Sequence, residues 1–274
     1  MATARGSGAT RGARPPARLG AAQRRTWALL EPSRRPRDPE VAHGYLDLIG
    51  HRAPASPGLG QSLMLTRALP QVYEHLWRPA MGRLAKGVLG PGMADEYAIA
   101  RDLLDLRSGQ TVLDVACGPG NFSRDFAAAV GPRGLVVGLD ASPTMLDRAV
   151  TDTRAGNVAY LRADAGDLPF GDGRLDAVCC FAALNLFGEP MRALAEMARV
   201  LAPGGHIALF TSLSSLPRRW RAVDGAVRVL TGVTMFDRDE LVGALADRRF
   251  DTIEQRRSGL TQFVGGRRGA QPPS

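Results

Sequence analysis

Residues 111–122, with the sequence TVLDVACGPGNF, constrain the fold of this chain more than any other segment. Their first five residues form a short apolar, β-branched run typical of a buried parallel strand, and the run ends at a turn containing Gly118 and Gly120. From Asn121, apolar residues recur at helical spacing until Gly131 ends the pattern. A strand, a tight glycine loop and a helix start let the backbone approach a nucleotide-like ligand closely, with N–H groups facing any carboxylate or phosphate.

A second strand is predicted over residues 135–139, and it ends at Asp140. An acidic side chain about twenty residues beyond the glycines can accept hydrogen bonds from both hydroxyls of a ribose. On these two features the ligand is either a dinucleotide or S-adenosylmethionine. The third glycine of the dinucleotide fingerprint is absent, because Ser123 occupies its position, and Pro119 separates the two glycines that remain.

Four motifs distinguish between these two ligands. In chain order they are Asp114-x-x-Cys117-Gly118-Pro119-Gly120, Gly138-Leu139-Asp140-Ala141-Ser142-Pro143, Ala163-Asp164-Ala165-Gly166-Asp167 and Leu201-Ala202-Pro203-Gly204-Gly205. Together they resemble the class I S-adenosylmethionine-dependent methyltransferases, in particular the small-molecule branch that includes the ubiquinone/menaquinone-biosynthesis C-methyltransferases. The resemblance spans residues 95–268, and four motifs in this order are highly specific.

The resemblance implies both a fold and a cofactor. The fold is α/β and Rossmann-like, with a seven-stranded, mostly parallel sheet of order 3-2-1-4-5-7-6, an antiparallel last strand and an N-terminal helical cap. The cofactor is S-adenosyl-L-methionine, with Asp164 accepting from the adenine amino group and the backbone N–H of Ala165 donating to a ring nitrogen. The expected cofactor-binding residues are Asp114, Ala116, Cys117, Gly118, Gly120, Asp140, Ala141, Met145, Asp164, Ala165 and Phe181.

The composition divides the chain into four parts. Residues 1–40 are rich in Arg, Ala, Gly and Pro, so we expect a disordered basic extension: a transit peptide or polyanion-binding arm, or a segment without function. Residues 41–93 are predicted to form a helical cap on the substrate side, 94–268 the methyltransferase domain, and 269–274 a disordered tail. The apolar run in the first part is too short for a secretory signal or a membrane span.

The charge distribution argues against a nucleic-acid partner. Residues 1–40 hold nine arginines and three carboxylates, a net +6 of the chain's formal +8, so the remainder carries only +2. A near-neutral body lacks the broad basic face that binds nucleic acid. The arginines of residues 248–268 are interpreted mainly as solvated, with peripheral contact to a membrane or to acidic-carrier phosphates as the alternative.

The cysteines and histidines predict neither a disulfide framework nor a metal site. There are three cysteines, two of them the adjacent Cys179 and Cys180, and the four histidines are scattered. We expect no metal and a reducing cytoplasm. Cys117 is interpreted as a small apolar filler of the cofactor loop rather than a nucleophile.

The sequence offers candidates, but no assignment, for a catalytic residue. Tyr73 and His75 lie in one crowded turn of the predicted cap, and Asn185 is the single polar side chain of residues 182–187. Each could orient an acceptor, and each has an equally plain structural interpretation. Residues 182–187 also lack the Asn/Asp-Pro-Pro-aromatic turn of enzymes that methylate amino groups of nucleic acids. Their apolar character suits a hydrophobic or aromatic acceptor.

We therefore expect a cytoplasmic methyltransferase that transfers a methyl group to oxygen or carbon of a small apolar or aromatic molecule by in-line displacement. The alternatives are an RNA or protein methyltransferase, a non-catalytic S-adenosylmethionine-binding regulatory protein, and a dehydrogenase. The sequence gives no indication of an oligomeric state.

Local patterns predict the remaining elements. Ser142 and Asp237 are the expected N-caps of two helices. Helices are predicted over 61–77, 79–88, 95–106, 190–201, 216–230 and 237–247, a short helical turn over 45–49, strands over 157–161, 175–181 and 206–213, and a hairpin of 250–256 with 260–267.

Overall fold

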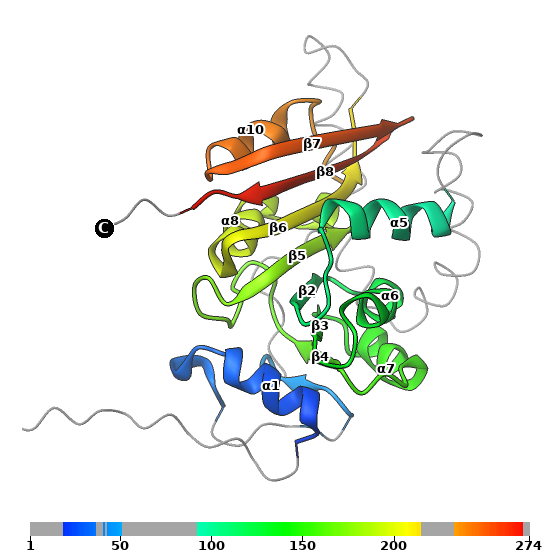
Figure 1. The fold of residues 1–274 in the computed structure, drawn as a ribbon, viewed down its shortest axis with the longest axis vertical. Helices are drawn as coiled ribbons and strands as arrows, with labels where there is room; N and C mark the ends of the chain where they lie inside the picture. The colour runs from blue at the N-terminus through cyan, green and yellow to red at the C-terminus, as the bar shows by residue number, and fades with distance from the viewer. Residues whose placement is uncertain (1–18, 37–40, 42, 51–91, 215–232, 271–274) are drawn as a thin grey trace, which may run out of the picture.

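A single mixed sheet organises the chain (Figure 1). The computed structural model describes residues 19–36, 41, 43–50, 92–214 and 233–270. These residues form eight strands: β1 (Leu46–Asp47), β2 (Thr111–Val115), β3 (Leu135–Asp140), β4 (Val158–Arg162), β5 (Leu175–Phe181), β6 (Leu201–Ser212), β7 (Phe250–Ser258) and β8 (Thr261–Arg268).

The strand order is β1-β4-β3-β2-β5-β6-β8-β7, which confirms the predicted order and adds one short strand at its edge. Strands β1 to β6 pair in parallel, whereas β8 runs antiparallel to both β6 and β7. The chain moves outward from β2 to β3 and β4 and then returns to β5 on the other side of β2. This reversal creates a crevice at the carboxyl ends of the central strands, where α/β proteins bind ligands.

Helices cover both faces of the sheet. On one face α5 (Met93–Leu103), α6 (Asn121–Val130) and α7 (Pro143–Asp152) pack against apolar side chains of the strands. On the other face α1 (Ala21–Leu29), α8 (Pro190–Val200) and α10 (Glu240–Ala246) share one large core with β2 to β6. Both faces of the central strands are therefore buried, as their continuous apolar runs require.

The N-terminal segment is folded where the structure describes it, so the predicted disorder of residues 1–40 is wrong for residues 19–36. Helix α1 buries Trp27, which is 2% exposed, together with Leu19 and Leu30 in the core of the sheet. Burial of one large aromatic side chain and its apolar neighbours thus offsets the free-energy cost of ordering this short, arginine-rich segment. Strand β1 joins the sheet as well, and the predicted helical turn over 45–49 is wrong.

Other boundaries differ locally from the predictions. The helix expected from Asp237 begins at Glu240 instead, and the Glu240 carboxylate accepts from the Asp237 N–H at 2.9 Å across the turn that precedes the helix. Strand β6 begins at Leu201 and includes Gly204, at φ 79°, within a register shift opposite β5. By contrast, the Ser142 side chain caps α7 as predicted, at 3.4 Å from the Met145 nitrogen. The helices predicted over 61–77, 79–88 and 216–230 lie outside the described residues.

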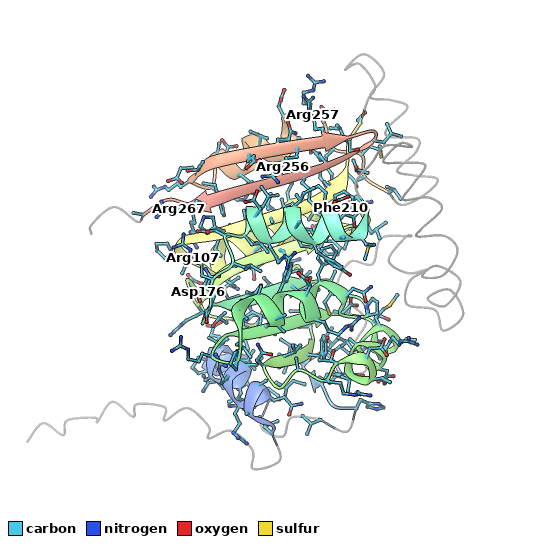
Figure 2. The ribbon with its side chains drawn as sticks, turned by 45° about the vertical axis from the view of Figure 1, so that its right-hand side comes forward. Arg107, Asp176, Phe210, Arg256, Arg257 and Arg267 are labelled. Carbon is cyan, nitrogen blue, oxygen red and sulfur yellow. The ribbon has the colours of Figure 1, made fainter. Side chains whose placement is uncertain are left out.

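Several C-terminal arginines contact the protein rather than solvent. Arg256 pairs with Asp102 of α5 and with Glu254, and Arg268 donates to the main-chain oxygens of Ala198 and Leu201. Arg257, at the β7 end of the sheet in Figure 2, is exposed. The interpretation of these arginines as mainly solvated is thus wrong for Arg256 and Arg268. In the described part of the chain, no helix is long and apolar enough to cross a membrane.

Candidate active site

A cavity of about 160 Å³ opens at the carboxyl ends of β2, β3, β4 and β5. It lies at the reversal of the chain path beside β2, where the sheet topology predicts a ligand. Its lining comes from the loop after β2, the start of α6, the β3–α7 connection, the loop after β4 and the segment that follows β5. Five parts of the sequence therefore meet at one site.

The end of β2 and the loop after it line the cavity with Asp114, Ala116, Cys117 and Gly118, all of which were predicted. The backbone of the loop takes left-handed conformations at Ala116, with φ 56°, and at Gly118, with φ 53°. A Cβ built on Gly118 meets no atom of the described residues within 4 Å, so the backbone here borders open space. A strained loop with an unobstructed surface is what close contact between a backbone and a ligand requires.

Asp114 is almost fully buried, with an exposed fraction of 2%. The Ser123 hydroxyl donates to its carboxylate at 2.6 Å, and the Cys179 thiol makes a longer contact of 3.6 Å with it. Burial raises the pKa of Asp114 to about 6, although both contacts oppose the rise. The Ser123 hydroxyl, which occupies the position of a missing fingerprint glycine, thus supports the acidic residue at the end of β2.

Asp140 at the end of β3 lines the cavity together with Ala141, and Met145 of α7 lies beside them. One carboxylate oxygen of Asp140 accepts from the Gly118 N–H at 2.8 Å, and the other accepts from the Ser142 N–H at 2.8 Å. Burial raises the pKa of Asp140 while these backbone N–H groups oppose the rise. The side chain therefore joins the two loops that frame the cavity.

Gly120 is a predicted cofactor residue that does not line the cavity. It has φ 77° and precedes α6 at the N-cap position. A Cβ here would lie 2.2 Å from the Tyr160 hydroxyl, so a glycine is required for close packing of the loop against β4. No side chain caps the start of α6, which leaves its first N–H groups directed toward the cavity end of the helix.

After β4, Ala163 and Ala165 line the cavity, whereas the predicted residue Asp164 does not. The Asp164 carboxylate accepts from the Gly166 N–H at 2.8 Å. The structure thus brings Ala165 into the site as predicted and places Asp164 in the turn that supports it.

An apolar wall follows β5. Phe181, which was predicted, lines the cavity, and Ala182 continues from it with a left-handed φ of 57°. The chain then enters the short 3-10 helix η3 (Leu184–Leu186), which presents Leu186 and then Phe187 to the cavity. Phe122 from α6 completes this side, at 4.5 Å between its ring centre and that of Phe181.

The candidate catalytic residues are not brought together in the described part of the chain. Asn185 lies in η3 but is absent from the cavity lining. Its main-chain oxygen accepts from the Thr234 N–H at 2.7 Å, and its side-chain oxygen is buried without a partner among the described residues. Tyr73 and His75 fall outside the described residues. Within those residues, no three His, Cys, Asp or Glu side chains form a group suited to a metal ion.

Comparison with known proteins agrees with this geometry. Residues 112–205 match the family model described as methyltransferase domain. The chain is 42% identical over 110 residues to the ubiquinone/menaquinone biosynthesis C-methyltransferase UbiE of Ectopseudomonas mendocina, covering 39% of this chain and 43% of that protein. It is 34% identical over 178 residues to an uncharacterized chloroplastic methyltransferase of Arabidopsis thaliana, covering 62% of this chain and 49% of the relative.

The fold comparison gives the same result. A crystal structure of an S-adenosylmethionine dependent methyltransferase from Mesorhizobium loti superposes with a TM-score of 0.54 at 22% identity, covering 64% of this chain and 99% of that one. Residues 112–205 are thus similar in sequence to a methyltransferase domain, and the chain shares its fold with an S-adenosylmethionine dependent methyltransferase. The chain spans less than half of the length of the two sequence relatives described above.

The residues that line the cavity fit an adenosyl cofactor. Open space over Gly118 admits a ligand against the backbone, and the Asp140 carboxylate retains acceptor capacity beyond the backbone N–H groups that it binds. Ala165 lies on the β4 side of Asp140, and the apolar wall with Phe181 lies on the β5 side. The cavity thus offers a carboxylate and apolar surfaces side by side, as a ligand with both polar and apolar parts requires.

Proposed function

We propose that this protein transfers the methyl group of S-adenosylmethionine to oxygen or carbon of a small apolar or aromatic acceptor. The observation that supports this proposal is the apolar wall of Phe181, Leu186, Phe187 and Phe122, which borders the same cavity as the Asp140 carboxylate. A polar ribose site beside an apolar surface suits a polar cofactor and a hydrophobic acceptor. The UbiE relatives are named C-methyltransferases, which favours carbon as the methylated atom.

Because of the chemistry of the cofactor, the protein needs only to position the reacting groups. S-adenosylmethionine supplies a methyl group already activated on a sulfonium. The residues of the chain then bind and orient the reacting groups and exclude water from them. Alignment of the reacting groups can lower the activation free energy by roughly 7 to 11 kcal/mol. In this proposal Asp140 and the Gly118 backbone hold the ribose end, while Phe181 and Phe187 shield the reacting groups from solvent.

The described cavity residues favour alignment over nucleophilic catalysis. Burial raises the pKa of the Cys117 thiol well above its usual value, so it stays protonated. Asp114 is engaged by Ser123 and almost completely covered. Neither is suited to attack an acceptor, and an acceptor that needs to lose a proton would have to transfer it elsewhere.

Two other functions remain as alternatives. An RNA methyltransferase would need a broad basic surface, which the formal charge of +2 outside residues 1–40 does not favour, and a protein methyltransferase is the other form of this alternative. A non-catalytic binding protein would keep the cofactor cradle and lack transfer, because a fold alone does not specify an activity.

The three cysteines, all free and buried, are consistent with our expectation of a reducing cytoplasm.

The test is a transfer assay with methyl-labelled S-adenosylmethionine and a panel of phenols, quinols and fatty acids. We expect label to appear in a flat aromatic acceptor and S-adenosylhomocysteine to inhibit the reaction. Calorimetry with S-adenosylhomocysteine and NAD is run in parallel. Binding of S-adenosylhomocysteine without transfer to any acceptor, including those of a metabolite extract, would favour the binding protein, and preferential binding of NAD would overturn the cofactor assignment.

A further inference from the structure

The connection from β4 to β5 passes β3 and β2, which lie between these two strands in the sheet. Residues 163–174 of this connection form only turns and a bridge, with no helix. Helix α1, from the opposite end of the chain, packs beside β4 and β3 in their shared core. The N-terminal segment thus covers the sheet next to a loop that lines the cofactor cavity through Ala163 and Ala165.

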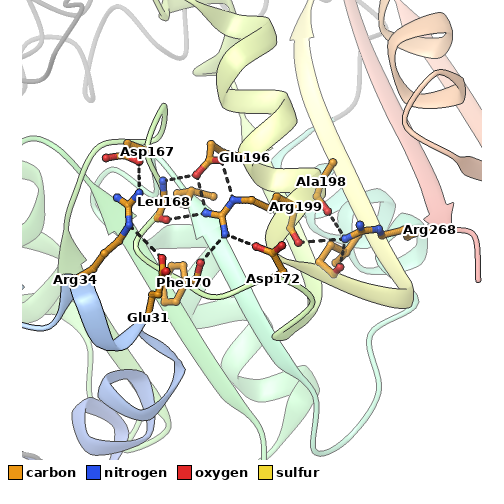
Figure 3. Close-up of polar contacts among 11 residues, drawn as sticks. Glu31, Arg34, Asp167, Leu168, Phe170, Asp172, Glu196, Ala198, Arg199 and Arg268 are labelled. Atoms are coloured by element: carbon orange, nitrogen blue, oxygen red, sulfur yellow. Dashed lines mark hydrogen bonds and ion pairs between the residues drawn. The ribbon is translucent and has the colours of Figure 1, made fainter. Parts of the chain in front are cut away.

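This loop is attached directly to the N-terminal segment (Figure 3). The Glu31 N–H donates to the Pro169 main-chain oxygen at 2.9 Å, and Leu30 forms an antiparallel bridge with Phe170. One turn of chain after Glu31, the Arg34 guanidinium contacts the Asp167 carboxylate at 2.7 Å. Asp167 lies two residues beyond Ala165, so the ion pair acts on the part of the loop nearest the cavity.

Helix α8 holds the same loop from another side. The Glu196 carboxylate accepts from the Leu168 N–H at 2.9 Å, and Arg199 donates to the main-chain oxygens of Leu168 and Phe170 at 2.9 and 2.8 Å. The backbone of the loop after Asp167 is therefore fixed by α8. Arg34 contacts the side chain of Asp167, which precedes this fixed part. The nearby guanidinium lowers the pKa of the Asp167 carboxyl group.

We propose that Arg34 is a positioning residue for the adenine end of the cofactor site, acting through Asp167 on the loop that carries Asp164 and Ala165. This inference rests on the proposed function, because it assumes that the adenine edge is recognised by Ala165, which lines the cavity, and by Asp164, which lies in the adjoining turn. It makes the N-terminal segment, which precedes the family match at residues 112–205, part of the binding site.

The test compares Arg34→Gln with Arg25→Gln in the full chain. Arg25 is the matched control, because it lies in the same segment but contacts a different part of the sheet. It donates to the main-chain oxygens of Gly134 and Arg133, which precede β3 and so lie at the amino ends of the strands, away from the cavity. Each protein is titrated by calorimetry with S-adenosylhomocysteine and with its inosyl analogue, in which a 6-oxo group replaces the adenine amino group.

We expect Arg34→Gln to raise the Kd for S-adenosylhomocysteine about two- to fivefold, the range of a partly exposed ion pair, and to change the Kd for the inosyl analogue by less than about twofold. The ratio of the Kd for the inosyl analogue to the Kd for S-adenosylhomocysteine should therefore fall. Arg25→Gln should keep the wild-type discrimination. Asp167→Asn removes the same ion pair from the loop side, and the double variant should lose no more than either single one.

Three results would overturn the inference. Unchanged discrimination in Arg34→Gln and Asp167→Asn would show that the ion pair does not act on adenine recognition. Equal weakening of both ligands would show a merely structural role. Absence of S-adenosylhomocysteine binding in the wild-type protein would instead contradict the proposed function, and this inference with it.

Discussion

Asp140 combines two tasks in one side chain. It joins the loops after β2 and β3 through Gly118 and Ser142, and it borders the cavity that we assign to the cofactor. Asp140→Asn keeps the size of the side chain but removes its charge and one acceptor oxygen. We expect S-adenosylhomocysteine affinity to fall by about 1.5 to 3 kcal/mol, the value of hydrogen bonds to a charged group, as measured by calorimetry.

A matched control for Asp140→Asn is Asp147→Asn. Asp147 lies on the neighbouring helix α7 with 53% of its side chain exposed and a contact to His43 at 3.5 Å. This change should leave the affinity at the wild-type value. Equal affinities in the Asp140 variant and the wild-type protein would show that the ribose lies elsewhere.

Asp114 makes stability depend on pH. Its folded-state pKa of about 6 exceeds the ordinary value of 3.8 for an aspartate, so between these values the folded state binds more protons than the unfolded state. Its contribution to the free energy of unfolding therefore falls as pH rises from 4 to 6. Relative to wild type, Asp114→Asn should gain up to about 3 kcal/mol between pH 4 and pH 7, as measured by urea unfolding at each pH. A pH-independent difference between the two proteins would contradict the raised pKa.

Residues in the strand-end loops were predictable because their signals are local. Asp140 follows an apolar run and Gly118 interrupts one, and both line the cavity. Leu186 and Phe187 were predicted only as members of an apolar segment. Which of its side chains meet the cavity depends on the left-handed turn at Ala182, and alanine gives no sign of a positive φ in a sequence.

Among the elements, α1 offers the clearest stability test. Trp27 is 2% exposed in the core shared with β3 and β4. Trp27→Ala should lower the free energy of unfolding by about 3 to 5 kcal/mol, as expected when a large buried aromatic side chain is truncated. Trp27→Phe retains most of the packing and removes an indole N–H that has no partner in the described part of the chain, so it should lower the free energy of unfolding much less. Urea unfolding measures both, and wild-type stability in Trp27→Ala would mean that α1 is dispensable.

The predictability of elements depended on the length of their apolar runs. Strands β2 and β5 have the predicted bounds because continuous apolar residues fill positions buried on both faces. Helix α1 was missed because arginines surround its few apolar residues. In the fold these arginines donate to main-chain oxygens, as Arg25 does to Gly134 and Arg35 does to Leu30, so they are not evidence of a solvated chain.

At the scale of the whole molecule, the N-terminal segment and the methyltransferase domain share one core. They should therefore unfold together. In a variant with Trp77 and Trp220 replaced by phenylalanine, Trp27 fluorescence and far-ultraviolet circular dichroism should change with the same urea midpoint. A fluorescence transition at a lower urea concentration would show that the segment detaches first, and would contradict a common core.

The position of β1 has a practical consequence for anyone who trims this protein to its recognised domain. Leu46 and Asp47 pair with Leu161 and Arg162, and Asp47 contacts the Arg162 guanidinium at 2.9 Å. A fragment that begins near residue 112 would leave the outer main-chain N–H and C=O groups of β4 without these partners. Such bare strand margins recruit other chains, so the shortened protein is expected to self-associate and precipitate where the longer one does not.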